Sequence, residues 1–257
     1  MNCAFQGGAT LRITRLFTDQ PISSSKQVVL EGNVAQHLGR VLRAKVGDVV
    51  ALFNGNGEEY VATVTEISKR AVCVVVGEAA TPATESRVHT LLGLCLSKGD
   101  RFDWAIQKAS ELGVGAIAPL YSERVDFSIP PDRVEKRVAH WQQIAISACE
   151  QCGRVRVPSV AHPQSLLQWV QDAIAEQKWV LHCSGGDTLP LQVSGHAIPQ
   201  SAALLIGPEG GLTDEEVAVA QDNGFGRVRM GPRVLRTETA PIVALSALSV
   251  LWGEIPG

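Results

Sequence analysis

The sequence predicts two domains of different class: a small β-barrel or sandwich over residues 1–80, then an α/β domain over residues 81–257. Short β-branched stretches and an Asn-Gly-Asn-Gly turn fill the first part. Residues 78–86 have the composition of a linker. Beyond them, apolar strand-like stretches alternate with amphipathic helix-like stretches, which is typical of a sheet covered by helices on both faces.

The first domain is expected to consist mainly of short strands. Residues 46–53 predict a turn followed by a strand, and residues 54–57 predict a tight hairpin, because Asn and Gly tolerate positive φ. Residues 59–67 alternate apolar and polar side chains, as a half-buried strand does. Residues 71–76 are a β-branched run that favours a strand. One short helix is expected over residues 34–42.

The second domain is expected to alternate strands with helices. Its predicted strands cover residues 88–96, 116–120, 179–183 and 202–206. Its predicted helices cover residues 102–112, 131–151, 166–174 and 240–251. The wholly apolar stretch 202–206 is typical of a strand inside a parallel sheet. The helix 240–251 is apolar nearly all round, so we expect it to be buried on most sides.

Composition excludes several classes of protein. No apolar run reaches the roughly 20 residues that a membrane span needs. The first residues lack the apolar core of a secretory signal, so a cytoplasmic location is expected. The six cysteines are scattered, and the single C-x-x-C at Cys149 and Cys152 lacks the second pair of a structural zinc site. No metal site is therefore predicted.

Positive charge is clustered although the net charge is −3. Residues 1–45 carry six lysines and arginines against two acidic residues, and a second cluster comprises Arg227, Arg229, Arg233 and Arg236. Local basic patches can bind phosphates even on an acidic protein. Taken alone, such charges are equally compatible with ordinary solvated surface.

Two loops have the composition of a ligand site. In residues 204–217, an apolar strand runs into a glycine-rich loop, and Thr213 with Glu216 forms a capping box that predicts the start of a helix. Loops at the carboxyl ends of parallel strands are where α/β proteins bind ligands. The loop matches neither a P-loop nor G-x-G-x-x-G, so a simple strand-to-helix turn remains the alternative.

The second loop, within residues 228–241, joins a short strand to the apolar helix and is crowded with arginines, threonines and a glutamate. Polar groups beside a buried helix need partners. A ligand pocket or a subunit interface would supply them.

Together, Gly-Pro-Glu-Gly-Gly at 207–211 and Leu-Arg-Thr-Glu-Thr-Ala at 235–240 resemble the signature of the bacterial 16S ribosomal RNA uridine-N3 methyltransferases of the SPOUT superfamily. Residues 37–43, 107–114, 122–124 and 150–154 also resemble motifs of that family. The resemblance extends from about Leu11 to Leu251.

The resemblance implies a PUA-like β-barrel RNA-binding domain over residues 1–80 and a SPOUT methyltransferase domain with a trefoil knot over residues 81–257. It also implies S-adenosyl-L-methionine as cofactor, 16S ribosomal RNA of the small ribosomal subunit as substrate, and a homodimer. Residues 1–10 precede the usual start of the family and are expected to be a flexible extension.

The resemblance also implies site residues. Cofactor contacts are expected from Leu205, Ile206, Gly207, Gly211, Met230, Gly231, Leu235, Thr237 and Ala240. RNA contacts are expected from Arg12, Arg15, His37, Arg40, Arg43, Arg124 and Arg154.

Three residues are candidates for the chemistry. Arg236 is the candidate for stabilising a uridine anion, because a guanidinium stays charged and can fork toward carbonyl oxygens. A phosphate or subunit contact is its alternative role. Glu209 and Glu238 are candidate proton acceptors, and each could instead cap a helix or pair with an arginine.

The sequence fits three other classes of protein less well. A non-catalytic RNA-binding module would not need two cofactor-shaped loops. An enzyme using a nicotinamide cofactor needs an early glycine fingerprint with an acidic residue about 20 positions later, which this sequence lacks. A cysteine hydrolase would use Cys149 or Cys183 with His140 or His182, but adjacency in sequence does not predict a catalytic pair.

Overall fold

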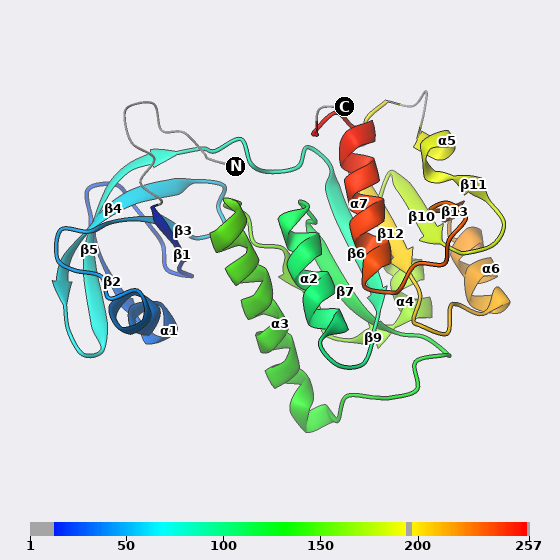
Figure 1. The fold of residues 1–257 in the computed structure, drawn as a ribbon, viewed down its shortest axis with the longest axis horizontal. Helices are drawn as coiled ribbons and strands as arrows, with labels where there is room; N and C mark the ends of the chain where they lie inside the picture. Colours follow the sequence, from blue (N-terminus) through cyan, green and yellow to red (C-terminus); the bar gives the residue numbers. More distant parts are fainter. Residues whose placement is uncertain (1–12, 194–196, 256–257) are drawn as a thin grey trace. The chain divides into compact units, whose positions relative to one another are not determined.

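The computed structural model describes residues 13–193 and 197–255 (Figure 1). The chain divides into two compact units. The first comprises Met1–Glu85 and Cys149–Val157, and the second comprises Ser86–Ala148 and Pro158–Gly257.

The first unit is a five-stranded sheet of order β1-β3-β4-β5-β2. All of its neighbouring strands are antiparallel except β1 and β3. A short helix, α1 (Gly32–Gln36), runs into a π-helical turn over His37–Val41, so the expected helix is present with an irregular second half. The strands are β1 (Thr14–Phe17), β2 (Gln27–Glu31), β3 (Val49–Phe53), β4 (Glu59–Ile67) and β5 (Ala71–Ala80).

The predicted hairpin joins β3 to β4. Phe53 is paired with Glu59 across it, and the connecting loop contains Gly55 and Gly57 with φ of 87° and 100°. Inward-facing residues of the sheet form one core with α1, in which Leu16, Leu30 and Leu52 are fully buried.

The first unit also takes in the end of helix α3 (Pro131–Cys152) and the residues after it, which a boundary near residue 80 does not include. Cys149 and Val155 are buried in one cluster with Phe53. Packing between segments about 100 residues apart, rather than any local pattern, brings Cys149–Val157 into this unit.

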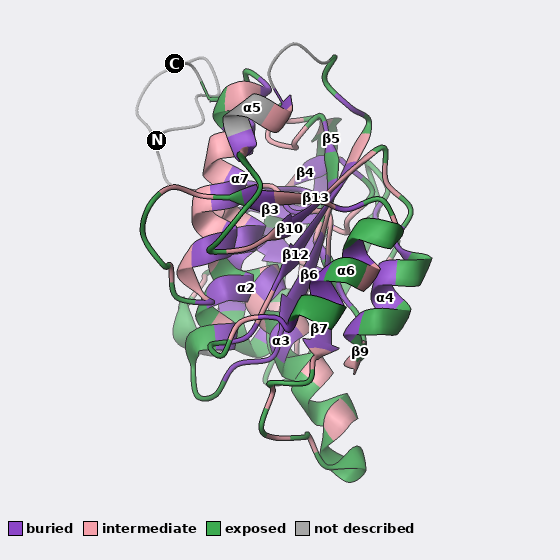
Figure 2. Cartoon of the chain, turned by 90° about the vertical axis from the view of Figure 1, so that its right-hand side faces the viewer, coloured by how far each residue is buried: buried purple, intermediate pink, exposed green. Residues whose placement is uncertain are grey.

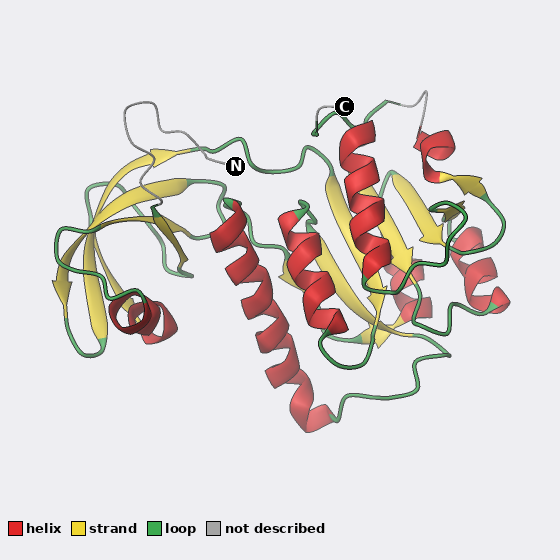
Figure 3. Ribbon diagram, viewed as in Figure 1, coloured by secondary structure: helices red, strands yellow, loops and turns green. Residues whose placement is uncertain are grey.

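The second unit is an eight-stranded sheet of order β11-β13-β10-β12-β6-β7-β8, with β9 also paired to β7, and every pair is parallel. Helices α2 and α7 contact each other on one face of the sheet, and α4 and α6 contact each other on the opposite face (Figures 2 and 3). This confirms the predicted α/β class with helices on both faces. The strands are β6 (His89–Cys95), β7 (Ala116–Tyr121), β8 (Ser159–Val160), β9 (Gln164–Ser165), β10 (Gln177–Leu181), β11 (Asp187–Thr188), β12 (Ser201–Ile206) and β13 (Gly226–Arg229). The helices besides α3 are α2 (Arg101–Glu111), α4 (Leu166–Asp172), α5 (Leu189–Val193), α6 (Asp214–Asp222) and α7 (Thr239–Leu251).

Two helices test the sequence predictions in detail. Helix α6 begins with the predicted capping box, in which Thr213 Oγ1 accepts from Glu216 N and the Glu216 carboxylate accepts from Thr213 N. Helix α7 is buried or half-buried along most of its length, as predicted: Ala244 and Leu248 are buried, and of its residues only Val250 is exposed, at 47%. Helices α2 and α5 pack against this apolar helix in addition to strand β12. Among the described residues, no helix is long and apolar enough to cross a membrane.

Candidate functional site

A cavity of about 480 Å³ lies where three neighbouring parallel strands of the second unit end. Strands β13, β10 and β12 are adjacent and parallel, so their carboxyl ends meet at one edge of the sheet. The loops that follow them, including residues 182–183, 207–212, 230–231 and 233–238, line the cavity. A cavity at this place and of this size is suited to a small organic ligand.

The structure brings nearly all the predicted cofactor and catalytic residues together. Leu205 does not line the cavity but is fully buried in β12, one residue before Ile206. The cavity-lining residues that had been predicted are Ile206, Gly207, Glu209, Gly211, Met230, Gly231, Leu235, Arg236, Thr237, Glu238 and Ala240.

The glycines of these loops have steric reasons to be glycine. A Cβ atom on Gly207 would lie 2.8 Å from Leu212 Cγ. Gly211 has φ of 72°, and its N–H donates to the Pro208 carbonyl at 2.9 Å, which closes a tight turn. Gly231 has φ of 109°, and nothing lies within 4 Å of where its Cβ would be. A ligand can therefore approach the backbone closely at Gly231.

Two carboxylates of the site differ in their partners. Glu209 forms a 3.0 Å ion pair with Arg101, and both side chains are more than two-fifths exposed. Glu238 has one buried carboxylate oxygen, Oε2, without a hydrogen-bond partner in the described part of the chain. Buried carboxylate oxygens are normally satisfied. The free Glu238 oxygen is therefore available to accept a hydrogen bond from a bound molecule.

The cavity-lining residues that sequence reasoning missed include Arg101, His182 and Cys183. Arg101 is the first residue of α2, and no local pattern marks it. His182 and Cys183 directly follow β10, and they could have been found only by knowing that β10 lies beside β12. The His182 ring is held by Arg227, whose Nη2 lies 2.8 Å from Nδ1.

Two of the predicted RNA-binding arginines are engaged inside the first unit. Arg15 pairs with Glu59, and its Nη2 donates to the carbonyls of Gly153 and Arg154, each at 3.1 Å. Arg154 donates to Glu85 Oε2 from Nε at 3.0 Å and from Nη2 at 2.9 Å, and its side chain is only 6% exposed. Both guanidinium groups therefore stabilise this unit.

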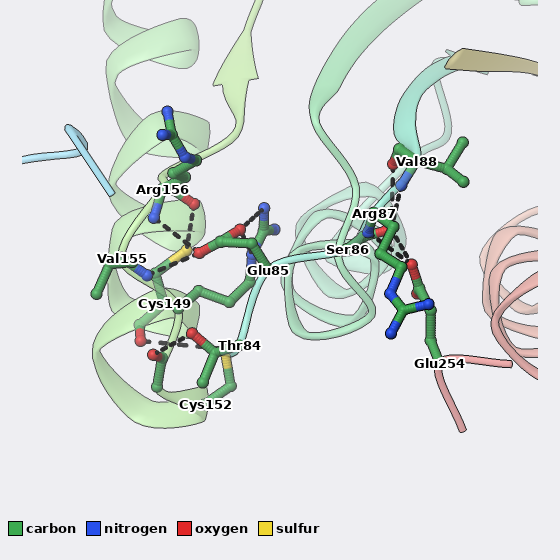
Figure 4. A network of polar contacts seen from close by, with 12 residues as sticks. Thr84, Glu85, Ser86, Arg87, Val88, Cys149, Cys152, Val155, Arg156 and Glu254 are labelled. Atoms are coloured by element: carbon green, nitrogen blue, oxygen red, sulfur yellow. Dashed lines mark hydrogen bonds and ion pairs between the residues drawn. The ribbon is translucent and has the colours of Figure 1, made fainter. Parts of the chain in front are cut away.

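Glu85 is the centre of that network (Figure 4). Its Oε1 accepts from the backbone N–H groups of Val155 and Arg156 at 2.8 and 2.9 Å. Beside it, Thr84 Oγ1 donates to the Gly153 carbonyl at 3.0 Å. In the second unit, Ser86 and the Arg87 N–H both donate to Glu254 Oε1.

The other predicted RNA-binding residues have varied surroundings. His37 and Arg43 are exposed, and Arg43 has φ of 53°. Arg124, in the second unit, is exposed, but its Nη1 donates to the Gly210 carbonyl at 2.8 Å. Arg12 and the expected extension over residues 1–10 lie outside the described residues, and of Arg40 only the backbone is described.

The surroundings of Cys149 do not favour its use as the nucleophile of a hydrolase. Burial raises the pKa of Cys149 to about 12, which is opposite to what a nucleophilic thiol needs. Within residues 13–193 and 197–255, no group of His, Cys, Asp and Glu could hold a metal ion.

Comparison with known families assigns the class of protein. Residues 84–249 match the model of an RNA methyltransferase domain, and residues 30–77 match that of an RNA methyltransferase PUA domain. The fold and the cavity are thus those of a two-domain RNA methyltransferase, with a PUA-like domain and an α/β domain. More narrowly, the chain belongs to the family of ribosomal RNA small subunit methyltransferase E.

Relatives cover almost the whole chain. Ribosomal RNA small subunit methyltransferase E of Buchnera aphidicola subsp. Schizaphis graminum is 31% identical over 248 residues, which are 95% of this chain and 98% of that protein. A Legionella pneumophila methyltransferase solved with its cofactor SAM is 37% identical, with a TM-score of 0.88 over 93% of this chain and 98% of that one. The family member from Neisseria gonorrhoeae, bound to S-adenosyl methionine, is 35% identical, with a TM-score of 0.86 over 94% and 98% of the two chains.

Proposed function

We propose that this protein transfers a methyl group from S-adenosyl-L-methionine to N3 of a specific uridine in the 16S ribosomal RNA of the small ribosomal subunit. The cavity formed by the loops after β10, β12 and β13 carries the proposal. The relatives are named as methyltransferases of small-subunit ribosomal RNA, which supports the proposed substrate. Two similar structures contain S-adenosyl methionine, which supports the proposed cofactor.

The residues of the cavity fit the cofactor. Gly231 leaves open space for it against the backbone. When bound, the cofactor supplies an electrophilic methyl group carried on a sulfonium. Binding contacts are proposed from the backbone around Ile206, Gly207, Gly211, Met230, Gly231, Leu235, Thr237 and Ala240, with Leu205 behind them.

The protein's own task is to make N3 of uridine nucleophilic. N3 carries a proton when neutral, so a proton acceptor and a positive group near the flanking carbonyl oxygens would both help. Glu238 is the better candidate acceptor, since Glu209 already pairs with Arg101. Arg236 lines the cavity, is exposed, and is our candidate for stabilising the anion.

RNA binding is proposed for the PUA-like domain, through His37, Arg43 and, by family resemblance, Arg12 and Arg40. Several phosphate contacts would make binding steeply dependent on salt. The target uridine would be single-stranded or flipped, because N3 is occupied in a Watson–Crick pair.

A trefoil knot, a homodimer and a cytoplasmic location complete the proposal. The dimer is supported by apolar side chains that the single chain leaves uncovered on the adjacent helices α2 and α7, where Trp104 is 44% and Val250 is 47% exposed. Sedimentation at several concentrations tests it, and a monomer throughout would contradict it. The location follows from the proposed substrate.

A methyl-transfer assay tests the central proposal. Labelled S-adenosyl-L-methionine is incubated with the protein and with small ribosomal subunits from cells that lack their own enzyme. Label is expected as 3-methyluridine at one site. Cofactor binding without label in intact subunits or naked RNA would contradict the proposed substrate, and absence of cofactor binding would favour a non-catalytic RNA-binding module.

A further inference from the structure

The glycine-rich loop after β12 is held by a segment that follows β7. Arg124 Nη1 donates to the Gly210 carbonyl at 2.8 Å and lies 3.5 Å from the Leu212 carbonyl oxygen. A second contact lies close by, where the Glu123 N–H donates to Glu216 Oε1 at 2.8 Å. Strand β6 separates β7 from β12 in the sheet, so these two contacts connect the segment after β7 to the loop and helix α6 that follow a strand not adjacent to β7.

The Arg124 contact fixes one particular peptide unit. The Gly210–Gly211 peptide has its carbonyl bound by Arg124 and its N–H bound by the Pro208 carbonyl at 2.9 Å. Both polar groups of this peptide therefore have partners before any ligand arrives. The same peptide lines the cavity.

The packing around Gly210 is shaped to this arginine. A Cβ atom on Gly210 would lie 3.3 Å from Arg124 Cβ and 3.4 Å from Arg124 Cδ, which is tighter than most real contacts. Glycine at this position therefore leaves room for the arginine stem against the loop. If the Arg124 side chain simply extended into solvent, it would not require a glycine at position 210.

We propose that Arg124 is a positioning residue that holds the glycine-rich loop in the conformation that receives the cofactor, instead of serving mainly as an RNA contact. A glycine-rich loop has many accessible conformations, and ordering it upon binding costs affinity. A loop ordered in advance avoids that cost. The inference rests on the proposed function only in taking S-adenosyl-L-methionine as the ligand.

The test measures cofactor affinity of the full chain without RNA, by calorimetry. Arg124→Ala is expected to raise the Kd for S-adenosyl-L-methionine about tenfold, the effect of losing one charge-assisted contact. Arg124→Lys should recover part of the lost cofactor affinity, because an ammonium can still donate to one carbonyl but lacks the planar fork of a guanidinium. Arg133→Ala removes another exposed arginine of the second unit, on α3, and should leave the Kd unchanged.

Hydrogen exchange of the ligand-free protein gives a second readout. The amides of residues 207–213 should exchange faster in Arg124→Ala than in the parent, with other segments of the second unit unchanged. If Arg124→Ala does not fold, Arg124→Gln takes its place under the same criteria. Unchanged cofactor affinity and unchanged exchange, with weakened RNA binding, would overturn the proposal and make Arg124 an RNA contact.

The two proposals can fail separately. If the parent protein binds no S-adenosyl-L-methionine, the proposed function fails. The exchange rates at residues 207–213 still decide whether Arg124 holds the loop, and an unchanged rate in the variant overturns that role.

Discussion

Arg101 and Glu209 form a 3.0 Å ion pair at the cavity, so the glutamate of the glycine-rich loop already has a cationic partner. Glu238, on the loop after β13, has a buried oxygen with no partner among the described residues. The sequence makes both carboxylates candidate proton acceptors. Their surroundings distinguish them, because the Glu209 carboxylate is already engaged by Arg101, whereas the Glu238 oxygen is free to accept a hydrogen bond from the substrate.

Glu238→Gln is therefore predicted to lower kcat by about 10²–10⁴, the usual contribution of a general base. Glu209→Gln should change kcat less than about fivefold, because exposed ion pairs contribute ~1 kcal/mol or less. Single-turnover methylation of the RNA substrate at saturating cofactor measures the methyl-transfer rate of each variant. A larger loss in Glu209→Gln than in Glu238→Gln would reverse the assignment.

Cys183 is predicted to be the first of the described cysteines to react with a thiol reagent, and the cofactor should protect it. It is exposed and lines the cavity. Cys95 and Cys149 are buried, and burial raises the pKa of each to about 12, so neither forms a reactive thiolate. Timed alkylation followed by mass spectrometry measures the order in which the cysteines react. Repeating it with S-adenosyl-L-methionine measures the protection of Cys183. Equal labelling of Cys183 in both samples would place it outside the bound cofactor's reach.

Local patterns predicted much of this protein. The hairpin at residues 54–57 and the capping box of Thr213 with Glu216 depend on residues within a few positions of one another, so their chemistry can be read from the sequence. The two ligand loops were recognisable because each follows a short strand and precedes a helix. Their convergence follows from the parallel order of β13, β10 and β12.

Pairings across long sequence separations could not be predicted. Arg15 pairs with Glu59, 44 residues away, and Arg154 pairs with Glu85, 69 residues away. From the sequence, both arginines are indistinguishable from solvent-exposed RNA contacts. Arg101 likewise meets Glu209 from 108 residues away, and only the three-dimensional fold brings it to the cavity.

The N-cap of α6 is predicted to stabilise the second unit measurably. Thr213→Ala removes the acceptor for the Glu216 N–H, a change that typically costs ~0.5–2 kcal/mol of folding free energy. In a chain of this size, a loss of that order lowers Tm by about 2–4 °C per kcal/mol. Ser165→Ala is the matched control, since Ser165 occupies the N-cap of α4 without a side-chain capping bond. Equal losses of Tm in the two variants would show that the capping bond contributes little.

Glu150 is predicted to make the stability of the first unit depend on pH. Burial raises the pKa of its carboxyl, and the hydrogen bond from the Phe17 N–H and the charges of His37 and Arg15 only partly oppose this. Because the folded-state pKa lies above the unfolded one, the carboxyl's favourable contribution is fully present below the unfolded pKa. That contribution is lost as pH rises through the folded pKa.

Glu150→Gln tests this directly, because glutamine keeps an oxygen for the Phe17 N–H but carries no charge. The variant should unfold at a higher temperature than the parent near pH 7, and the difference should vanish near pH 4, around the ordinary pKa of a glutamate. Thermal unfolding of both proteins at the two pH values measures it. Glu31→Gln, at an exposed position of the same unit, serves as the control. A gain for Glu150→Gln that is equal at both pH values would mean that altered packing, and not the buried charge, sets the difference.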